Sequence, residues 1–470
     1  MSESGGRDGR PAAHAPPETA RQDPTLSSAP TQTGSAPTAV PRVIPRDQHP
    51  ISRRSISPSA LRVLYRLRDA GHAAYLVGGA VRDLLIGIQP KDFDVATDAT
   101  PEQVRHLFRN CRLIGRRFRL AHVVFGREII EVATFRSGGG DDNGEGDREV
   151  HADGRVLRDN VYGTIEEDAV RRDFTANALY YAIEDFSVRD YVGGFDDVQA
   201  RVMRLIGDPE TRYREDPVRM LRAVRLAAKL GFSIDPTSAA PMPELASLLH
   251  DAAPARLFDE CQKLFLSGHA LASFEGLEVH GLLAALLPET ARALASNRSG
   301  ALRKMLVEGL QGTDARVARG EPVSPAFLFA LLLWPGYCRE LMQLQGQGVH
   351  AIEAERRAAD RITLQQSTRI ALPRRFSLPM QEIWLLQSRM RQRKRSQRLL
   401  AHPRFRAAFD FLVLRQAAAP EHAADVEYWR ALQAGMPPPQ AGEEEFAQGE
   451  STDAAPARKR RRRRRGGGAG

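Results

Sequence analysis

Two aspartates separated by one residue, Asp92 and Asp94, are the side chains of this sequence best suited to carry chemistry. If Lys91 to Val95 forms a strand, both carboxylates lie on one face, because side chains alternate along a strand. Neighbouring carboxylates repel each other and stay ionised at little cost only when a cation lies between them. Such oxygen ligands suit Mg²⁺, which proteins usually hold through one or two carboxylates and substrate phosphates.

A glycine pair a short way upstream, Gly78 and Gly79, could supply the phosphate half of such a site. The pattern predicts a strand from Ala74 to Val77, a turn at the glycines and then a helix, so that free backbone N–H groups face the turn. Each feature alone could be an ordinary strand–helix turn or a solvated acidic pair. Together, in one short βαβ-like segment, they favour metal-dependent phosphoryl or nucleotidyl transfer from a nucleoside triphosphate.

The composition is that of a reduced protein with several domains. The 470 residues have room for two to four domains, and a hydrophobic content of 42% is sufficient for real cores. The 3 cysteines are scattered without metal-ligand spacing, which favours a cytoplasmic chain with neither disulfides nor a zinc site. No apolar run approaches the roughly 20 residues that span a bilayer, and residues 1–40 lack the apolar segment of a secretory signal. We therefore expect no membrane partner.

The net charge of +9 is concentrated in one run of cations from Arg458 to Arg465. Such a block repels itself and buries nothing, so it cannot fold alone. It could be an inert or solubilising tail, or a nuclear-localisation signal. Attachment to nucleic-acid phosphates is favoured, because each neutralised phosphate releases counterions.

The hydrophobic pattern changes once along the chain, from mixed helices and strands to helices alone. We therefore expect an α+β protein in which a small mixed α/β head precedes an all-α part. The expected segments are a disordered arm at 1–55, the head at 56–205, the helical part at 206–432 and a disordered tail at 433–470.

Within the head, the strongest local pattern is a hairpin of residues Leu120–Phe125 and Glu128–Phe135 around a turn at Gly126. Glu131 lies on its second strand, as an extra active-site carboxylate or an ordinary exposed glutamate. The Gly- and Asp-rich residues 137–155 are interpreted as a mobile loop.

A second charged group, Arg171-Arg172-Asp173, is predicted at the start of a helix. Arginines there could bind triphosphate oxygens. Asp173 could take the ribose hydroxyl or approach the metals, or it could simply cap the helix.

Another helix is predicted to open with Asp216 as its cap and Pro217 at the first helical position. Arg219, Arg222 and Arg225 then recur every third residue and form one stripe. The stripe could be a solvated basic face. Alternatively, Asp216 and Arg219 form a donor–acceptor pair that reads the Watson–Crick edge of a base.

Four of these segments together resemble the tRNA nucleotidyltransferase/poly(A) polymerase family, a branch of the DNA-polymerase-β-like nucleotidyltransferase superfamily. The resemblance implies a polymerase-β-like head at 56–205, a neck with the base-reading helix at 206–270 and an RNA-binding body at 271–432. The segments, in family order and spacing, are Gly78–Asp83, Asp92–Asp94, Arg171–Asn177 and Glu215–Arg219.

Within that family the chain is similar to bacterial poly(A) polymerases rather than to CCA-adding enzymes. A basic C-terminal extension is typical of the polymerase branch, and three further segments resemble it: Arg112–Val123, Pro325–Ala330 and Phe405–Asp410. The resemblance implies template-independent addition of adenylate from ATP to RNA 3′ ends, with pyrophosphate leaving. The RNA would include mRNA and other transcripts, the tails would promote decay, and RNA-decay proteins are possible partners.

The resemblance also assigns roles to individual residues. Asp92 and Asp94 would hold two Mg²⁺ ions, with Asp173 as a third active-site residue. The triphosphate would contact Gly78, Gly79 and Arg82, and the nucleoside would contact Arg172, Asp216 and Arg219.

Two alternatives remain open from the sequence: CCA addition to tRNA, which shares these motifs, and a non-catalytic RNA-binding protein. The intact acidic pair and glycine pair count against the second. A basic cluster, Arg389 to Arg395, could be a track for the RNA backbone or a solvated surface. The low aromatic content, 7%, argues for a sequence-indifferent grip on phosphates rather than a stacking platform.

Overall fold

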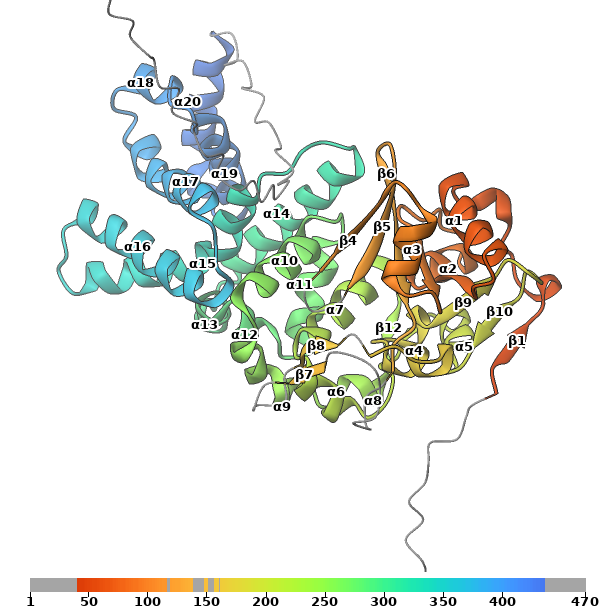
Figure 1. Cartoon of the computed structure of the whole chain (residues 1–470). Coiled ribbons are helices and arrows are strands. Elements are labelled where there is room, and N and C mark those ends of the chain that lie inside the picture. Colours follow the sequence, from red (N-terminus) through yellow and green to blue (C-terminus); the bar gives the residue numbers. More distant parts are fainter. Residues whose placement is uncertain (1–39, 116–118, 138–147, 151–155, 160, 436–470) are drawn as a thin grey trace, which may run out of the picture. The chain divides into compact units, whose positions relative to one another are not determined.

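The computed structural model describes residues 40–115, 119–137, 148–150, 156–159 and 161–435. Its head is built on an eight-stranded sheet (Figure 1). Neighbouring strands are antiparallel except β3 and β6, which run parallel. In sheet order the strands are β1 (Arg42–Ile44), β10 (Val188–Asp190), β9 (Leu179–Ala182), β2 (Ala74–Val77), β3 (Asp94–Thr97), β6 (Glu128–Thr134), β5 (Leu120–Phe125) and β4 (Cys111–Ile114).

The segment that carries the glycine and aspartate pairs folds back on itself. Strand β2 leads through the glycine turn into α2 (Gly79–Leu85), and β3 then returns antiparallel to β2, with Val77 opposite Asp94. The predicted βαβ-like arrangement is therefore wrong, because a βαβ unit requires parallel strands. The reversal matters for function, since it brings the end of β2 and the start of β3 to the same edge of the sheet.

The head begins earlier than predicted. Strand β1 pairs with β10, and Ile44 and Ile51 are buried in the core. The predicted disordered arm at 1–55 is thus wrong for residues 42–55, because a short strand paired with a partner far along the chain leaves no local signal. Residues 1–39 lie outside the described part of the chain.

Helix α1 (Pro58–Asp69) packs on β2, β3 and β6. Its first turn is capped by Ser57, whose hydroxyl accepts the N–H of Ala60 at 3.0 Å, and its apolar stripe enters the head core. The other helices of the head are α3 (Pro101–Leu107), α4 (Ile165–Arg171) and α5 (Gly194–Gln199).

The predicted hairpin is confirmed, since β5 and β6 pair around the turn at Gly126. The predicted mobile loop at 137–155 is wrong in part, because β7 (Arg148–Val150) pairs with β8 (Val156–Asp159). Residues 138–147 and 151–155 lie outside the described residues.

From Ile206 onward the described chain is almost entirely helical, as predicted. The exception is β12 (Ser233–Ile234), which pairs in parallel with β11 (Val202–Met203). The helices are α6 (Pro209–Glu215), α7 (Val218–Leu230), α8 (Pro236–Ala239), α9 (Met242–Leu245), α10 (Pro254–Phe265), α11 (Ala270–Val279), α12 (Leu283–Leu286), α13 (Pro288–Ser296), α14 (Ala301–Ala318), α15 (Pro325–Gly346), α16 (Ala351–Ile370), α17 (Arg374–Gln392), α18 (Ser396–Leu400), α19 (Phe405–Ala418) and α20 (Ala423–Ala434).

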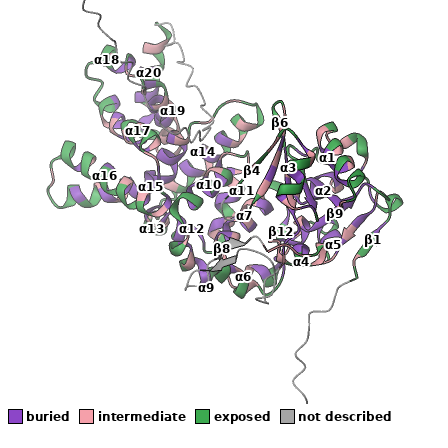
Figure 2. Ribbon diagram, viewed as in Figure 1, coloured by how far each residue is buried: buried purple, intermediate pink, exposed green. Residues whose placement is uncertain are grey.

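The core of this helical part is centred on α15, which packs against α13, α16 and α17. Figure 2 shows the buried residues along these helices. Two buried tryptophans satisfy their N–H groups on carbonyls of the core: Trp384 donates to Ala330 and Trp429 donates to Met390, each at 3.0 Å. None of the helices in the described residues is both long and apolar enough to cross a membrane.

Candidate active site

The site forms where β2 ends and β3 begins. Gly78 has a φ of 75°, a left-handed conformation that favours glycine, and it precedes the first residue of α2. A Cβ at this position would lie 3.7 Å from Nη1 of Arg172, so the guanidinium faces the turn directly. The turn therefore presents backbone N–H groups and one cation to the same space.

Arg82 lies behind this turn rather than in front of it. Its side chain is 4% exposed, and it forms an ion pair of 2.6 Å with Asp83 and a hydrogen bond to Oδ1 of Asn177. The donors of Arg82 are thus already used to hold the turn against the strand-to-strand connection at Asn177.

Three carboxylates, Asp92, Asp94 and Glu131, lie at or near the start of β3 and on the neighbouring strand β6. Asp92 and Asp94 are exposed and Phe93 between them is buried, so the alternation predicted for a strand is present, although β3 itself begins only at Asp94. The parallel register of β3 and β6 places Glu131 beside Asp94. Glu131 Oε2 in turn lies 3.3 Å from Nε2 of His122 on the next strand.

This crowding changes the acidity of Asp94. Loss of solvent around the carboxylate, followed by the negative charge of Glu131, raises its pKa to about 6, with Asp92 adding to the effect and Arg172 opposing it. Asp94 retains accessible surface, so the desolvation is partial. A carboxylate that ionises reluctantly because of its neighbours is one that a divalent cation would stabilise.

No group of three or more His, Cys, Asp or Glu side chains in the described ranges is arranged to hold a metal ion by itself. Two carboxylates that share the coordination with substrate phosphates fit Mg²⁺, which rarely uses an all-protein cage. The residues present therefore fit a metal that is completed by the substrate.

Arg172 is fixed in place by a buried network. Its Nε and Nη2 donate to Oδ2 of Asp168 at 3.1 and 2.9 Å, and its Nε also donates to the hydroxyl of Tyr180 at 2.9 Å. The Tyr180 hydroxyl donates to the same Asp168 oxygen at 2.7 Å. Since Nη1 is the part that faces Gly78, the network aims one free edge of the guanidinium at the turn.

The prediction that Arg171 and Arg172 open a helix is wrong. Helix α4 ends at Arg171, and Arg172 is its C-cap. An arginine at a helix C-terminus is favoured by the helix dipole, and Asp168 one turn earlier is its natural partner. This i, i+4 spacing is a signal that the sequence interpretation missed.

Asp173 does not cap a helix either, since the short 3₁₀ turn that follows has Phe174 in that position. Its Oδ2 forms an ion pair with Arg222, accepting from Nε at 2.9 Å, and its Oδ1 accepts from the N–H of Phe174 and from Asn177. Burial alone would raise the pKa of Asp173, but the Arg222 charge and these hydrogen bonds hold it below its usual value. Both oxygens are thus occupied.

The arginine stripe on α7 is not a solvated face. Arg219 donates to Glu215 at 2.8 Å, Arg222 pairs with Asp173, and Arg225 donates to Glu260 at 2.9 Å. The stripe therefore fastens α7 to the head, to α6 and to α10.

Asp216 and Arg219 are separately engaged. Asp216 Oδ1 accepts the N–H of Val218 at 3.3 Å and Oδ2 accepts from Arg256 at 2.8 Å, while Arg219 also donates to the carbonyl of Arg212 at 2.7 Å. Helix α7 begins at Val218, so Asp216 does bond its first turn, one residue further out than predicted.

A mixed sheet that carries a glycine turn and an acidic pair at adjoining strand ends, followed by helices, defines a nucleotidyltransferase with a polymerase-β-like head. Such folds generally use divalent metal ions. Three family models match the chain: the poly A polymerase head domain at residues 74–204, the probable RNA and SrmB-binding site of polymerase A at 231–294 and the polymerase A arginine-rich C-terminus at 347–466.

Among nucleotidyltransferases, the chain is more extensively similar to poly(A) polymerases than to CCA-adding enzymes. Poly(A) polymerase I of Salmonella typhi is 51% identical over 85% of this chain and 87% of its own length, and that of Haemophilus influenzae is 46% identical over 79% and 83%. The CCA-adding enzyme of Bacillus subtilis is 40% identical over only 45% of this chain and 50% of its own. The solved Bacillus stearothermophilus CCA-adding enzyme in complex with CTP has a TM-score of 0.56 and 26% identity over 81% of this chain and 83% of that chain.

The chain belongs to the bacterial poly(A) polymerase family. It catalyses template-independent polyadenylation of RNA 3′ ends, and CCA-adding enzymes are only distant relatives. The two alternatives left open by the sequence, CCA addition and a non-catalytic RNA-binding role, are thereby set aside.

Proposed function

We propose that Asp92 and Asp94 form the catalytic centre of RNA adenylation and that they hold two Mg²⁺ ions. When bound, the ions would neutralise the triphosphate and lower the charge that develops during in-line displacement. The observation that carries this proposal is the placement of Glu131 beside Asp94 at the strand ends that also carry Asp92. Desolvation, and then the charge of Glu131, accordingly raises the pKa of Asp94 to about 6.

The residues around the pair bind and orient the triphosphate. The N–H groups at Gly78 and Gly79 and the free edge of Arg172 face one space, so we assign Arg172 to the triphosphate rather than to the nucleoside that the family resemblance implies. Arg82 is buried against the turn and supports it. In the reaction, the RNA 3′-hydroxyl loses its proton to water and its oxygen forms a bond to the α-phosphorus of ATP as the bond to pyrophosphate breaks. Asp173 is a positioning residue, because its carboxylate is committed to Arg222 and Asn177.

Base choice is assigned to Asp216 and Arg219 on the neck at 206–270, and RNA binding to the body at 271–432. The Arg389–Arg395 cluster and the cationic run at Arg458–Arg465 would add phosphate contacts. Cytoplasmic mRNA and other transcripts are the proposed substrates, their tails would promote decay, and decay proteins are the proposed partners.

The test compares extension of a generic RNA with Mg²⁺ and each nucleoside triphosphate separately. We expect long products with ATP, and a loss of at least about a hundredfold in rate for Asp92→Ala and Asp94→Ala, because several kcal/mol of charge stabilisation disappear. RNA affinity should stay near that of the unchanged protein. Asp98→Ala, which removes an exposed carboxylate paired with His72, is the matched control and should remain active. An active Asp94→Ala variant would show that the metals bind elsewhere.

A further inference from the structure

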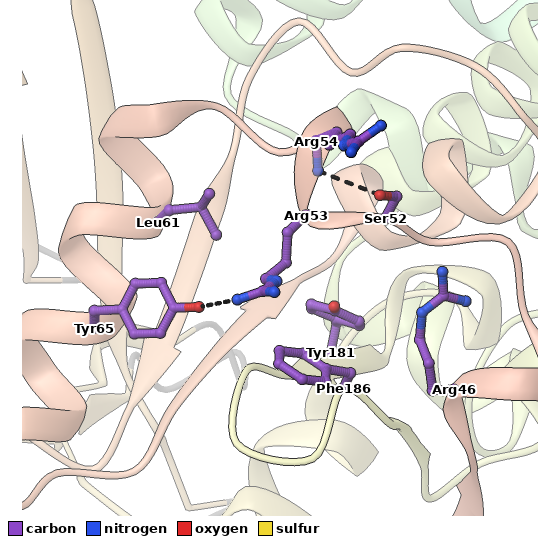
Figure 3. Close-up of a pocket in the computed structure, with 8 residues that line it drawn as sticks. All are labelled: Arg46, Ser52, Arg53, Arg54, Leu61, Tyr65, Tyr181 and Phe186. Carbon is purple, nitrogen blue, oxygen red and sulfur yellow. Dashed lines mark hydrogen bonds between the residues drawn. The ribbon is translucent and has the colours of Figure 1, made fainter.

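A basic pocket lies on the surface of the head (Figure 3). Its volume is about 490 Å³, within the range of small-ligand sites. Arg46, Arg53 and Arg54 of the N-terminal segment line one side, and aromatic residues of α1 and of the β9–β10 connection line the other. No acidic side chain is among the described residues that line it.

The three guanidiniums keep unused donors. Arg53 donates to the hydroxyl of Tyr65 at 3.0 Å, and Arg46 donates to the carbonyl of His49 at 2.8 Å, while the hydrogen bond of Arg54 comes from its backbone N–H. Within the part of the chain that the structure describes, none of the three forms an ion pair with a carboxylate. Three cations in one lining without counter-charge are suited to phosphate groups.

The aromatic side of the pocket is held in a strained conformation. Phe186 has a φ of 61°, which is rare for a bulky residue, and its carbonyl accepts a hydrogen bond of 2.9 Å from Nε2 of the buried His49. The Phe186 ring lies under the Arg53 guanidinium, 4.7 Å from its centre, and Figure 3 shows Arg53 between Tyr65 and the rings of Tyr181 and Phe186. The strain therefore serves to place a ring beside the cations.

The pocket and Asp94 lie on opposite faces of the sheet. Tyr181, which lines the pocket, pairs with Leu76, whereas Asp94 pairs with Val77, the next residue of β2. Because neighbouring residues of a strand point to opposite faces, one ligand at the triphosphate site does not also fill the pocket.

A second groove continues from the pocket along α1. It has a volume of about 1000 Å³ and shares Leu61 and Tyr65 with the pocket. It adds three cations, Arg62, Arg66 and Arg109, and one carboxylate, Asp69, which pairs with Arg68. A free nucleotide would end in the pocket, but a polymer of phosphates could follow both. The continuity favours RNA.

We propose that the pocket binds a nucleotide of the RNA substrate upstream of its 3′ end, with the phosphate on Arg46, Arg53 and Arg54 and the base against Tyr65 and Phe186. The proposal rests on RNA as the substrate and assigns it a contact remote from catalysis. The sequence gives no sign of this arrangement, since the arginines and rings come from three separate elements. Such a contact would retain the RNA between successive additions.

The experiment measures binding of a long oligoadenylate, and of a short one that fills only the active site, over a range of salt concentrations. The variants are Arg53→Ala/Arg54→Ala and the single Arg54→Glu, which leaves the contacts of Arg53 intact. The matched control is Arg127→Ala, an exposed arginine of the β5–β6 turn outside both cavities. Thermal unfolding checks that each variant folds.

For both pocket variants we expect about tenfold weaker binding of the long RNA, because charged hydrogen bonds to its phosphates are removed. The slope of log affinity against log salt should flatten by about 0.7 for each phosphate that is no longer neutralised. Short-RNA binding, the KM for ATP and kcat at saturating RNA should not change, and Arg127→Ala should behave like the unchanged protein.

Unchanged long-RNA affinity and slope in Arg54→Glu would overturn the proposal, as would an equal loss with Arg127→Ala or with the short RNA. A raised KM for ATP with normal RNA binding would assign the pocket to free nucleotide instead. The proposed active site is tested separately, by the activity of Asp94→Ala, so a failure of that proposal can be told apart from a failure of this one.

Discussion

At the scale of single residues, the ion pair with Arg222 gives Asp173 a supporting role in the site rather than a direct part in the chemistry. Asp173 was a candidate for the metals, yet both its oxygens are bonded within the protein. Its partner lies on α7, so the pair joins the helix to the chain segment that carries Arg172. A carboxylate held in this way orients its neighbours rather than binding an ion.

Arg222→Met should therefore destabilise the protein, because it leaves the Asp173 charge uncompensated. Fully buried pairs lose 3–5 kcal/mol on removal of one partner, and we expect about 2 kcal/mol, because 35% of the Arg222 side chain is exposed. Urea unfolding of the head, followed by tyrosine signals, measures the change.

The contribution of the Asp173–Arg222 pair to the free energy of unfolding depends on pH, and the sign of that dependence follows from the lowered pKa of Asp173. The pair contributes fully above the ordinary pKa of an aspartate, and its contribution is lost as pH falls through the lower pKa of the folded state. The deficit of Arg222→Met should thus be constant near neutral pH and shrink only in acid. A deficit that varies across neutral pH would point to another group.

Base selection is also decided by single side chains. Arg219→Ala should reduce the preference for ATP over CTP by about tenfold, the worth of one charged hydrogen bond to a base. Glu215→Gln removes the ion partner of Arg219 but not Arg219 itself, so selectivity should persist. Single-nucleotide insertion rates measure both. A slower but equally selective Arg219→Ala enzyme would make the arginine a structural link between α6 and α7.

At the scale of elements, α14 and α15 approach closely at Gly309. A Cβ there would lie 2.3 Å from Cδ2 of the buried Leu331, whereas a Cβ at Gly312, one turn along the same helix, would meet nothing within 4 Å. The two glycines thus have the same helical setting and opposite surroundings.

Gly309→Ala should destabilise the protein, since overpacking costs about 1–3 kcal/mol and the gain in helix propensity offsets up to about 1 kcal/mol of it. Gly312→Ala keeps only that gain and should stabilise by up to about 1 kcal/mol. Urea titration of both variants tests the contact, and equal effects would mean that the helices adjust freely.

Elements set by local signals were predictable, and those set by distant partners were not. The β5–β6 hairpin and the capping of α3 by Thr100 follow from adjacent residues. Strand β1 depends on β10, which lies well over a hundred residues later. In the site, the acidic and glycine pairs could be predicted from the sequence. The partners of Asp173 and Asp216, which are Arg222 and Arg256, lie far along the chain and could not be predicted.

At the scale of the whole molecule, the C-terminal cations are predicted from the sequence to act on RNA affinity alone. Deletion of residues 458–470 removes the run of cations but none of the motifs. Thermal stability should hardly change, and the salt dependence of RNA binding should flatten by about 0.7 for each phosphate that the run had neutralised. The extension rate at saturating RNA should be retained. Superimposable salt titrations would leave the run with a role in solubility.

The tryptophans lie in only one part of the molecule, so tryptophan fluorescence reports on that part. The chain has 3 tryptophans, Trp334, Trp384 and Trp429, and all are buried in helices α15, α17 and α20. Tryptophan emission therefore reports on the helical part alone, and the head is silent at those wavelengths. If the head and the helices that carry the tryptophans lose structure at different denaturant concentrations, the fluorescence transition would follow Gly309→Ala more closely than Arg222→Met, whose ion pair joins α7 to the head. A single spectroscopic midpoint would then describe only part of the enzyme.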